Sequence, residues 1–244
     1  MRLLLILVAA GAVAVLALAT AKGSWFAAGT PRPQVIVAFG DSITSGLGLR
    51  GATVWTDVLA RRLEASAPGR RVSVVNRGIS GNRLLRDTMG PAGLGRFDGD
   101  VLRQPGVSWI TVLIGINDLG FAGAAEPDDP PVTAAQLIDG YQQLVRKARA
   151  RGVAIYGCTL LPFEGAAGGY YTPEKEAVRA AVNAWIRTPG SFDGVIDFDR
   201  LMRDPSRPGR LLPAYDSGDH LHPSDRGQQT MGDAVDLELF RLRE

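Results

Sequence analysis

The chain has 244 residues, and its 27 basic and 25 acidic side chains leave a formal net charge of +2. So small and dispersed a charge excludes a nucleic-acid-binding surface, which needs clustered lysine and arginine. The single cysteine excludes an intrachain disulfide, so the stability of the protein must come from a packed core.

The first 33 residues are not expected to belong to the folded domain. Arg2 precedes an apolar run from residue 3 to 18, and residues 19–21 offer a small-residue cleavage site. This layout predicts a secretory signal peptide over residues 1–21, with an uncleaved membrane anchor as the alternative. Residues 22–33 are interpreted as a leader segment and residues 34–244 as one folded domain. We therefore expect a secreted or periplasmic, in any case extracytoplasmic, protein.

Along the rest of the chain, short apolar runs alternate with amphipathic stretches. The apolar runs predict strands at 35–39, 72–75, 109–114, 153–160 and 195–198. Apolar side chains at helical spacing predict helices near 55–63, 137–148 and 173–186, and a last helix from Asp225 to Leu239. Near-continuous apolar strands that alternate with helices indicate an α/β fold whose mostly parallel sheet is covered on both faces.

Four short polar blocks fall where these elements end, and ligands bind such sheets beyond the carboxyl ends of the strands. They are Gly40-Asp41-Ser42, residues 76–82, Gly115-Ile116-Asn117-Asp118 and Asp219-His220-Leu221-His222. Acyl transfer needs a nucleophile, a base, an orienting acid and hydrogen-bond donors for the developing oxyanion. A strand-end serine, followed late in the chain by an acid and a histidine, is compatible with a Ser/His/Asp hydrolase.

With these four blocks the chain resembles the SGNH branch of the GDSL esterases and lipases. The matches run from about residue 35 to residue 223, which is nearly all of the expected domain. The resemblance implies the SGNH hydrolase fold, a flavodoxin-like three-layer sandwich around a five-stranded, mostly parallel sheet. The longer strings 76–85 and 215–223 are similar to those of esterase modules attached to bacterial xylanases.

The same resemblance implies a role for each matched residue. Ser42 falls on the nucleophile, His222 on the base and Asp219 on the acid that orients the imidazole. The oxyanion would be held by the backbone N–H groups of Ser42 and Gly81 and by the side-chain amide of Asn117. Glycine at position 81 also makes sense by itself, because a backbone donor aimed at a substrate needs close approach.

We therefore expect a monomeric serine esterase that acts on short-chain esters, foremost O-acetyl groups on carbohydrate, through an acyl-enzyme on Ser42. No cofactor, metal or nucleic acid is expected, and membrane contact only through an uncleaved N-terminus. Two alternatives remain open: a lysophospholipase or thioesterase with the same triad, and a catalytically silent carbohydrate-binding domain. The small residues at 122–125 and 165–169 predict a shallow site beside Tyr170 and Tyr171, whose rings could stack on a sugar.

Two patterns point to other chemistry. His220 is a competing base and could form a zinc-binding His-x-His pair with His222. The sequence has no third histidine and no cysteine cluster, and the Asp-x-x-His register favours His222 as the base. The stretch Gly46-Leu47-Gly48-Leu49-Arg50-Gly51 satisfies G-x-G-x-x-G, yet no acidic residue ends the second predicted strand. NAD binding is therefore not predicted.

Structural roles are expected for several other residues near the blocks. Asp41 and Asp118 are predicted to cap turns through backbone N–H groups, and the Asp197–Asp199 pair to brace the fold. Cys158 is predicted to be a packed thiol. The arginines at 77, 83 and 96 are expected to be solvated.

Overall fold

The computed structural model describes residues 34–47, 53–66, 72–124 and 128–241. The predicted signal peptide (1–21), the leader (22–33) and most of the G-x-G-x-x-G stretch lie outside the described residues. Within the described ranges, no helix is both long enough and apolar enough to cross a bilayer.

Five parallel strands form the central sheet in the order β2-β1-β3-β4-β5. Their bounds are β1 Gln34–Gly40, β2 Val72–Gly78, β3 Val107–Leu113, β4 Ala154–Cys158 and β5 Gly194–Ile196. The expected flavodoxin-like α/β fold is thereby confirmed. Because the strand order reverses between β1 and β3, the crevice beyond their carboxyl ends is where this fold binds ligands.

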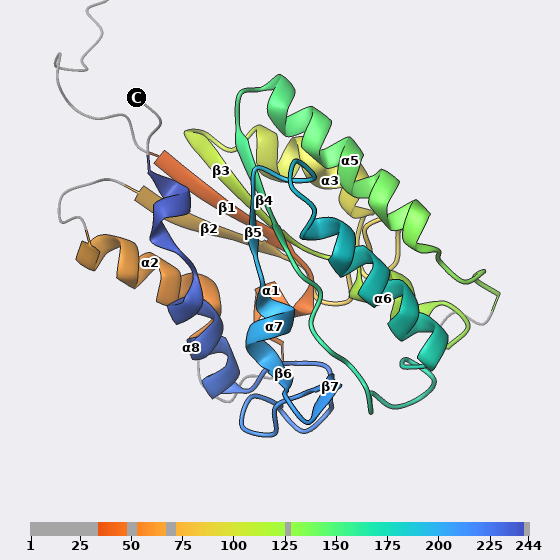
Figure 1. The fold of residues 1–244 in the computed structure, drawn as a ribbon. Coiled ribbons are helices and arrows are strands. Elements are labelled where there is room, and N and C mark those ends of the chain that lie inside the picture. The colour runs from red at the N-terminus through yellow and green to blue at the C-terminus, as the bar shows by residue number, and fades with distance from the viewer. Residues whose placement is uncertain (1–33, 48–52, 67–71, 125–127, 242–244) are drawn as a thin grey trace, which may run out of the picture. The chain divides into compact units, whose positions relative to one another are not determined.

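Helices cover both faces of the sheet, with α2 and α8 on one face and α3, α5 and α6 on the other (Figure 1). The central strand β1 is almost wholly apolar because both faces of the sheet are covered, and its Ile36, Val37 and Phe39 are fully buried. The edge strand β2 is half-exposed and carries polar residues. The helices are α1 Ser42–Ser45, α2 Trp55–Ser66, α3 Gly93–Phe97, η1 Asp98–Leu102, α4 Ile116–Phe121, α5 Ala134–Ala150, α6 Pro173–Ile186, α7 Phe198–Met202, α8 Asp225–Ala234 and η2 Leu237–Phe240. A short hairpin joins β6 Arg203–Asp204 to β7 Arg207–Leu211.

The last predicted helix, from Asp225 to Leu239, is in fact two. Arg62 Nη1 donates to the backbone oxygens of Gly232 at 2.8 Å and Val235 at 2.7 Å, so it satisfies carbonyl groups that a helix end leaves open. Asp236 then accepts the N–H of Glu238 at 3.0 Å and starts η2 as its N-cap. The apolar residues keep their helical spacing between α8 and η2, so the sequence pattern did not indicate the break. The polar contacts of Arg62 and Asp236 account for it.

Candidate active site

The first strand delivers Ser42 to the crevice through a turn that has room only for glycine at position 40. A Cβ on Gly40 would lie 2.2 Å from Thr44 Oγ1 and 2.8 Å from the backbone oxygen of Leu113. Asp41 then accepts the N–H of Ile43 at 3.0 Å, which caps the short helix α1. Ser42 is the first residue of α1, and its Oγ lies 2.8 Å from His222 Nε2.

The histidine comes from the loop before α8, and the acid three residues earlier fixes its ring. His222 Nδ1 lies 2.6 Å from Asp219 Oδ2, while Asp219 Oδ1 accepts the backbone N–H groups of Leu221 at 2.9 Å and His222 at 2.8 Å. Burial by itself would raise the pKa of Asp219, but the hydrogen bonds from His222 and Leu221 outweigh it and lower this pKa to about 2. The carboxylate is therefore ionised and holds the Nδ1–H of the imidazole.

His220, the competing base, lies elsewhere. Its Nδ1 is 2.6 Å from Asp216 Oδ2, and its side chain is 43% exposed, whereas the ring that meets Ser42 belongs to His222. Within the described part of the chain, no cluster of three or more His, Cys, Asp and Glu side chains has the arrangement of a metal site.

Gly81 and Asn117 follow β2 and β3, the two strands that flank β1 in the sheet. Gly81 has φ of +72°, and a Cβ there would come within 2.5 Å of Met89 Cγ, so both backbone and space require glycine. Asn117, on α4, donates through Nδ2 to the backbone oxygen of Asn82 at 3.0 Å. A carbonyl can only accept, so this contact fixes which end of the amide carries nitrogen and leaves its second N–H for a ligand.

Tyr170 completes the environment of Asn117, a role that the sequence did not predict. Its hydroxyl donates to Asn117 Oδ1 at 2.8 Å, and burial raises its pKa well above the ordinary value, so the proton stays in place. The ring packs edge-on against Phe121 and Phe163 and occupies the space where a Cβ of Gly120 would lie, 2.0 Å away. Tyr170 is half-buried and lines a hollow together with Ala166 and Ala167, so the stacking of its ring on a sugar stays a prediction.

Arg96 joins the first two blocks and is buried, contrary to the expectation of a solvated side chain. It donates to the backbone oxygen of Gly40 at 2.8 Å, to that of Arg77 at 3.0 Å and to Asn82 Oδ1 at 2.9 Å. Its guanidinium also lies 4.1 Å from the centre of the Phe39 ring. Arg83 is buried as well and pairs with Asp129, so of the three arginines two were wrongly predicted.

Two buried carboxylates, Asp41 and Asp118, accept backbone N–H groups of turns near Ser42 and Asn117, as predicted for both residues. Asp118 accepts the N–H groups of Leu84 at 2.6 Å and Leu85 at 2.9 Å, and Asp41 caps α1. Burial raises the pKa of Asp41 to about 7 and that of Asp118 to about 6, since water no longer stabilises the charged form. The predicted packed thiol of Cys158 is likewise buried, and burial raises its pKa.

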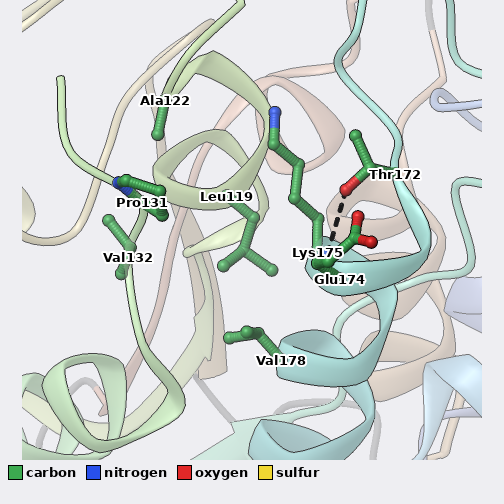
Figure 2. Close-up of a pocket in the computed structure, with 8 residues that line it drawn as sticks. All are labelled: Leu119, Ala122, Pro131, Val132, Thr172, Glu174, Lys175 and Val178. Atoms are coloured by element: carbon green, nitrogen blue, oxygen red, sulfur yellow. Dashed lines mark hydrogen bonds between the residues drawn. The ribbon is translucent and has the colours of Figure 1, made fainter. Parts of the chain in front are cut away.

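An apolar pocket of about 260 Å³ lies between α4 and α6, lined by residues such as Leu119, Val132 and Val178 (Figure 2). Its lining includes neither Ser42 nor His222. At its rim Lys175 Nζ donates to the backbone oxygens of Gly120 at 2.9 Å and Gly169 at 2.8 Å, which ties α4 to the loop of Tyr170. The pocket is therefore separate from the contact between Ser42 and His222.

A strand-end serine with a buried histidine beside it, on a five-stranded parallel sheet, defines an α/β enzyme of the serine-hydrolase type. The GDSL-like Lipase/Acylhydrolase family model matches residues 38–230, and the chain belongs to that family. It is thus a carboxylic ester hydrolase, and a silent carbohydrate-binding domain is no longer a competing interpretation. No curated protein sequence matches the chain significantly.

Solved structures share the fold at low sequence identity. The acetylxylan esterase Axe2 from Geobacillus stearothermophilus is 23% identical, with a TM-score of 0.64 over 88% of this chain and 97% of its own. The lipase/acylhydrolase from Enterococcus faecalis is 23% identical, with a TM-score of 0.60 over 82% and 92%. LAE5, an alpha/beta hydrolase from the metagenome of Lake Arreo, is 23% identical, with a TM-score of 0.61 over 85% and 95%.

Proposed function

We propose that this chain is a serine esterase that removes short acyl groups, foremost acetyl, from carbohydrate through an acyl-enzyme on Ser42. The observation that carries the proposal is the continuous line of contacts from Ser42 Oγ through both nitrogens of His222 to Asp219, at 2.8 and 2.6 Å. Asp219 holds the proton on Nδ1, which leaves the lone pair of Nε2 directed at the serine hydroxyl.

In the first half of the reaction, Ser42 Oγ attacks the ester carbonyl while His222 Nε2 takes its proton. The negative charge that develops on the carbonyl oxygen is met by the N–H groups of Ser42 and Gly81 and by the free N–H of the Asn117 amide. His222 then gives its proton to the departing alcohol oxygen. In the second half, water gives a proton to the same nitrogen and attacks the acyl carbon. The bond from that carbon to Ser42 Oγ then breaks, Oγ takes the proton from His222 Nε2, and the acid leaves.

The short-chain preference has support in the surroundings of Gly81. Met89 lies directly over this glycine, and Phe121 Cε2 is 3.8 Å from the position of its absent Cβ, so side chains close in on the acyl side. The apolar pocket beside α4, which could accommodate hydrocarbon, has no catalytic residue in its lining. Both features favour acetyl or butyryl over chains of eight carbons or more.

Carbohydrate as the alcohol part is supported by the strings 76–85 and 215–223, which resemble those of xylanase-attached esterase modules. The shared fold of the acetylxylan esterase Axe2 is compatible with this substrate class. Export is part of the proposal and is supported by the signal-peptide pattern of residues 1–21. A monomeric state is part of the proposal too.

A substrate panel tests the proposed function. Values of kcat/KM are compared for the p-nitrophenyl esters of acetate, butyrate, octanoate and palmitate, and for acetylated xylo-oligosaccharides, with Ser42→Ala as the blank. The proposal predicts a maximum at acetate or butyrate and acetate release from the oligosaccharides. A maximum at octanoate or beyond would shift the function to a lysophospholipase or thioesterase that uses the same triad.

A further inference from the structure

His220 adopts a backbone conformation that its residue type normally avoids. Its φ is +63°, and among the described residues it is the one non-glycine position with positive φ. This left-handed region is strained for a residue with a Cβ, and glycine would occupy it without strain. Such strain is retained where a side chain has a use, which makes the surroundings of this imidazole informative.

Asp216 fixes the orientation of the His220 ring. Its Oδ1 accepts the backbone N–H groups of Gly218 at 2.8 Å and His220 at 3.0 Å, while its Oδ2 lies 2.6 Å from His220 Nδ1. An ionised carboxylate only accepts, so Nδ1 carries the hydrogen and the lone pair of a neutral ring is on Nε2. Within the described part of the chain, no hydrogen bond uses Nε2.

Gly165 holds the other side of the ring. A Cβ at this position would lie 3.0 Å from His220 Cδ2 and 3.1 Å from Cγ, so the glycine leaves only the space that the imidazole fills. The φ of Gly165 is +106°, which again favours glycine. Gly165 and His220, which both have a positive φ, therefore lie against each other where their two loops meet.

A hollow of about 300 Å³ opens beside this ring, and its lining includes Ala166, Ala167, Tyr170, Asp219 and His220. Asp219 contacts the imidazole of His222, and Tyr170 contacts the amide of Asn117, so the hollow adjoins both halves of the catalytic apparatus. Its walls are mostly apolar, from small side chains, Leu221 and the ring of Tyr170, with polar groups from His220 and Asp219. A sugar ring fits such a lining, because its C–H face packs on apolar side chains while its hydroxyl groups reach the few polar groups.

We propose that this hollow is the subsite for the alcohol part of the ester, and that His220 Nε2 accepts a hydrogen bond from a hydroxyl group of a bound sugar. The inference rests on the proposed function and adds a residue that distinguishes carbohydrate from simple alcohols. When the acyl-enzyme transfers its acyl group to a sugar, which reverses its formation, the same subsite binds the sugar that accepts the acyl group. Its hydroxyl gives a proton to His222 Nε2 and attacks the acyl carbon, the bond to Ser42 Oγ breaks, and Oγ takes the proton.

Acyl transfer measures this subsite without requiring the natural substrate. The enzyme is acetylated with p-nitrophenyl acetate in the presence of methyl β-D-xylopyranoside, and the ratio of acetyl xyloside to free acetate is determined by mass spectrometry. The same ratio is determined with ethanol as acceptor. Each ratio compares two fates of one acyl-enzyme, so a change in the rate of its formation cancels.

His220→Gly is the informative variant, because glycine removes the imidazole and also relieves the backbone strain. Loss of one hydrogen bond predicts that transfer to the xyloside, relative to ethanol, falls about threefold to tenfold. His220→Asn, which tolerates positive φ but has a shorter reach, is expected to fall between the wild type and the glycine variant. Asp216→Asn keeps an oxygen for the backbone N–H groups but frees the ring, and it is expected to lower the same ratio.

Two results would overturn the inference. One is no measurable transfer to the xyloside by the wild type; the other is an unchanged xyloside-to-ethanol ratio in His220→Gly, including the case in which all rates fall together because His220 only braces the loop. The failure of the proposed function is a separate result. It would appear in the substrate panel as a preference for long acyl chains, whatever the acceptor ratio.

Discussion

The two sides of the site are held in place in different ways. On the nucleophile and oxyanion side, Asp41, Asn82 and Asp118 are fully buried, and hydrogen bonds join segments far apart in the sequence, such as Arg96 to Gly40. On the histidine side, the carboxylates of Asp216 and Asp219 accept N–H groups two to four residues away, and the contact of His222 with Ser42 joins this loop to a distant segment. The Asp219 side chain there is 49% exposed.

This difference matches what each side has to do. Oxyanion donors are effective when they are fixed before the substrate arrives, since no reorganisation is then needed during the reaction. In the proposed mechanism, His222 exchanges protons with serine, alcohol and water, and a short loop fixed by its own carboxylates is enough to orient it. The two sides should therefore respond differently to mutation and to pH.

The largest effect is expected from removing the base. His222→Ala leaves Ser42 without a proton acceptor and should lower kcat/KM by about 10⁴-fold or more on p-nitrophenyl acetate. The folded state, followed by circular dichroism, should persist. Comparable activity in His222→Ala and the wild type would mean that another group activates the serine, and the proposed roles on this side of the site would be wrong.

Substitutions at Asn117 and at its neighbour Tyr170 should lower kcat by different amounts. Asn117→Ala removes one donor and is expected to lower kcat about 100- to 1,000-fold. Tyr170→Phe keeps the amide but removes the hydroxyl that orients it, and should lower kcat by about tenfold with little change in KM. Tyr171→Phe is the matched control, because this neighbouring ring packs against Phe163 and makes no described contact with Asn117.

If Tyr170→Phe and Tyr171→Phe have the same kcat, the hydroxyl of Tyr170 does not position Asn117. A rise in KM alone would point to substrate contact instead, and a fall in stability without a fall in kcat would point to packing.

The smallest expected effect is on the free energy of unfolding. Its change with pH has opposite signs for Asp41 and for Asp219, because the pKa of the first is raised and that of the second is lowered. Burial raises the pKa of Asp41 from 3.8 to about 7, so its contribution to stability is complete below pH 3.8 and is lost as pH rises through 7. The pKa of Asp219 is lowered from 3.8 to about 2, so its contribution is present above pH 3.8 and is lost as pH falls through 2. Urea unfolding at pH 5 and pH 8 separates the two.

Between pH 5 and pH 8, Asp41→Asn should reduce the pH dependence of the free energy of unfolding, because asparagine does not titrate, while Asp118, whose pKa is raised to about 6, retains its part of it. Asp219→Asn should leave that dependence as in the wild type, since its own transition lies below pH 4. An unchanged pH dependence in Asp41→Asn would show that this buried carboxyl does not titrate in the range assigned to it.

The sequence predicted what local patterns encode. Apolar runs indicated the strands, and the blocks after two of them indicated Ser42 and Asn117, because a parallel sheet brings the carboxyl ends of its strands together. The α/β sheet was predicted for the same reason. The Asp-x-x-His register before the last helix indicated His222. Helix ends were predicted less well, since the break at Asp236 depends on Arg62, which lies far away in the sequence.

The supporting contacts could not be predicted because they join segments without any spacing rule. Tyr170 and Asn117 are 53 residues apart, and Arg96 and Gly40 are 56 residues apart. From sequence alone, an arginine or tyrosine in a loop is expected to be solvated. Only the fold shows that Arg96 donates to backbone oxygens and that Tyr170 donates to the amide of Asn117. The strain at His220 was also invisible in the sequence, because φ depends on how the loop closes.

Covalent labelling tests the central assignment, Ser42 as the nucleophile, most directly. The protein is treated with a fluorophosphonate, digested, and the modified residue is located by mass spectrometry. We expect modification of Ser42 alone, with labelling lost in Ser42→Ala and strongly slowed in His222→Ala. Ser80 is the informative comparison, because its hydroxyl faces Ser45 Oγ at 2.9 Å rather than a base. Labelling of Ser80 with Ser42 unmodified would contradict the assignment.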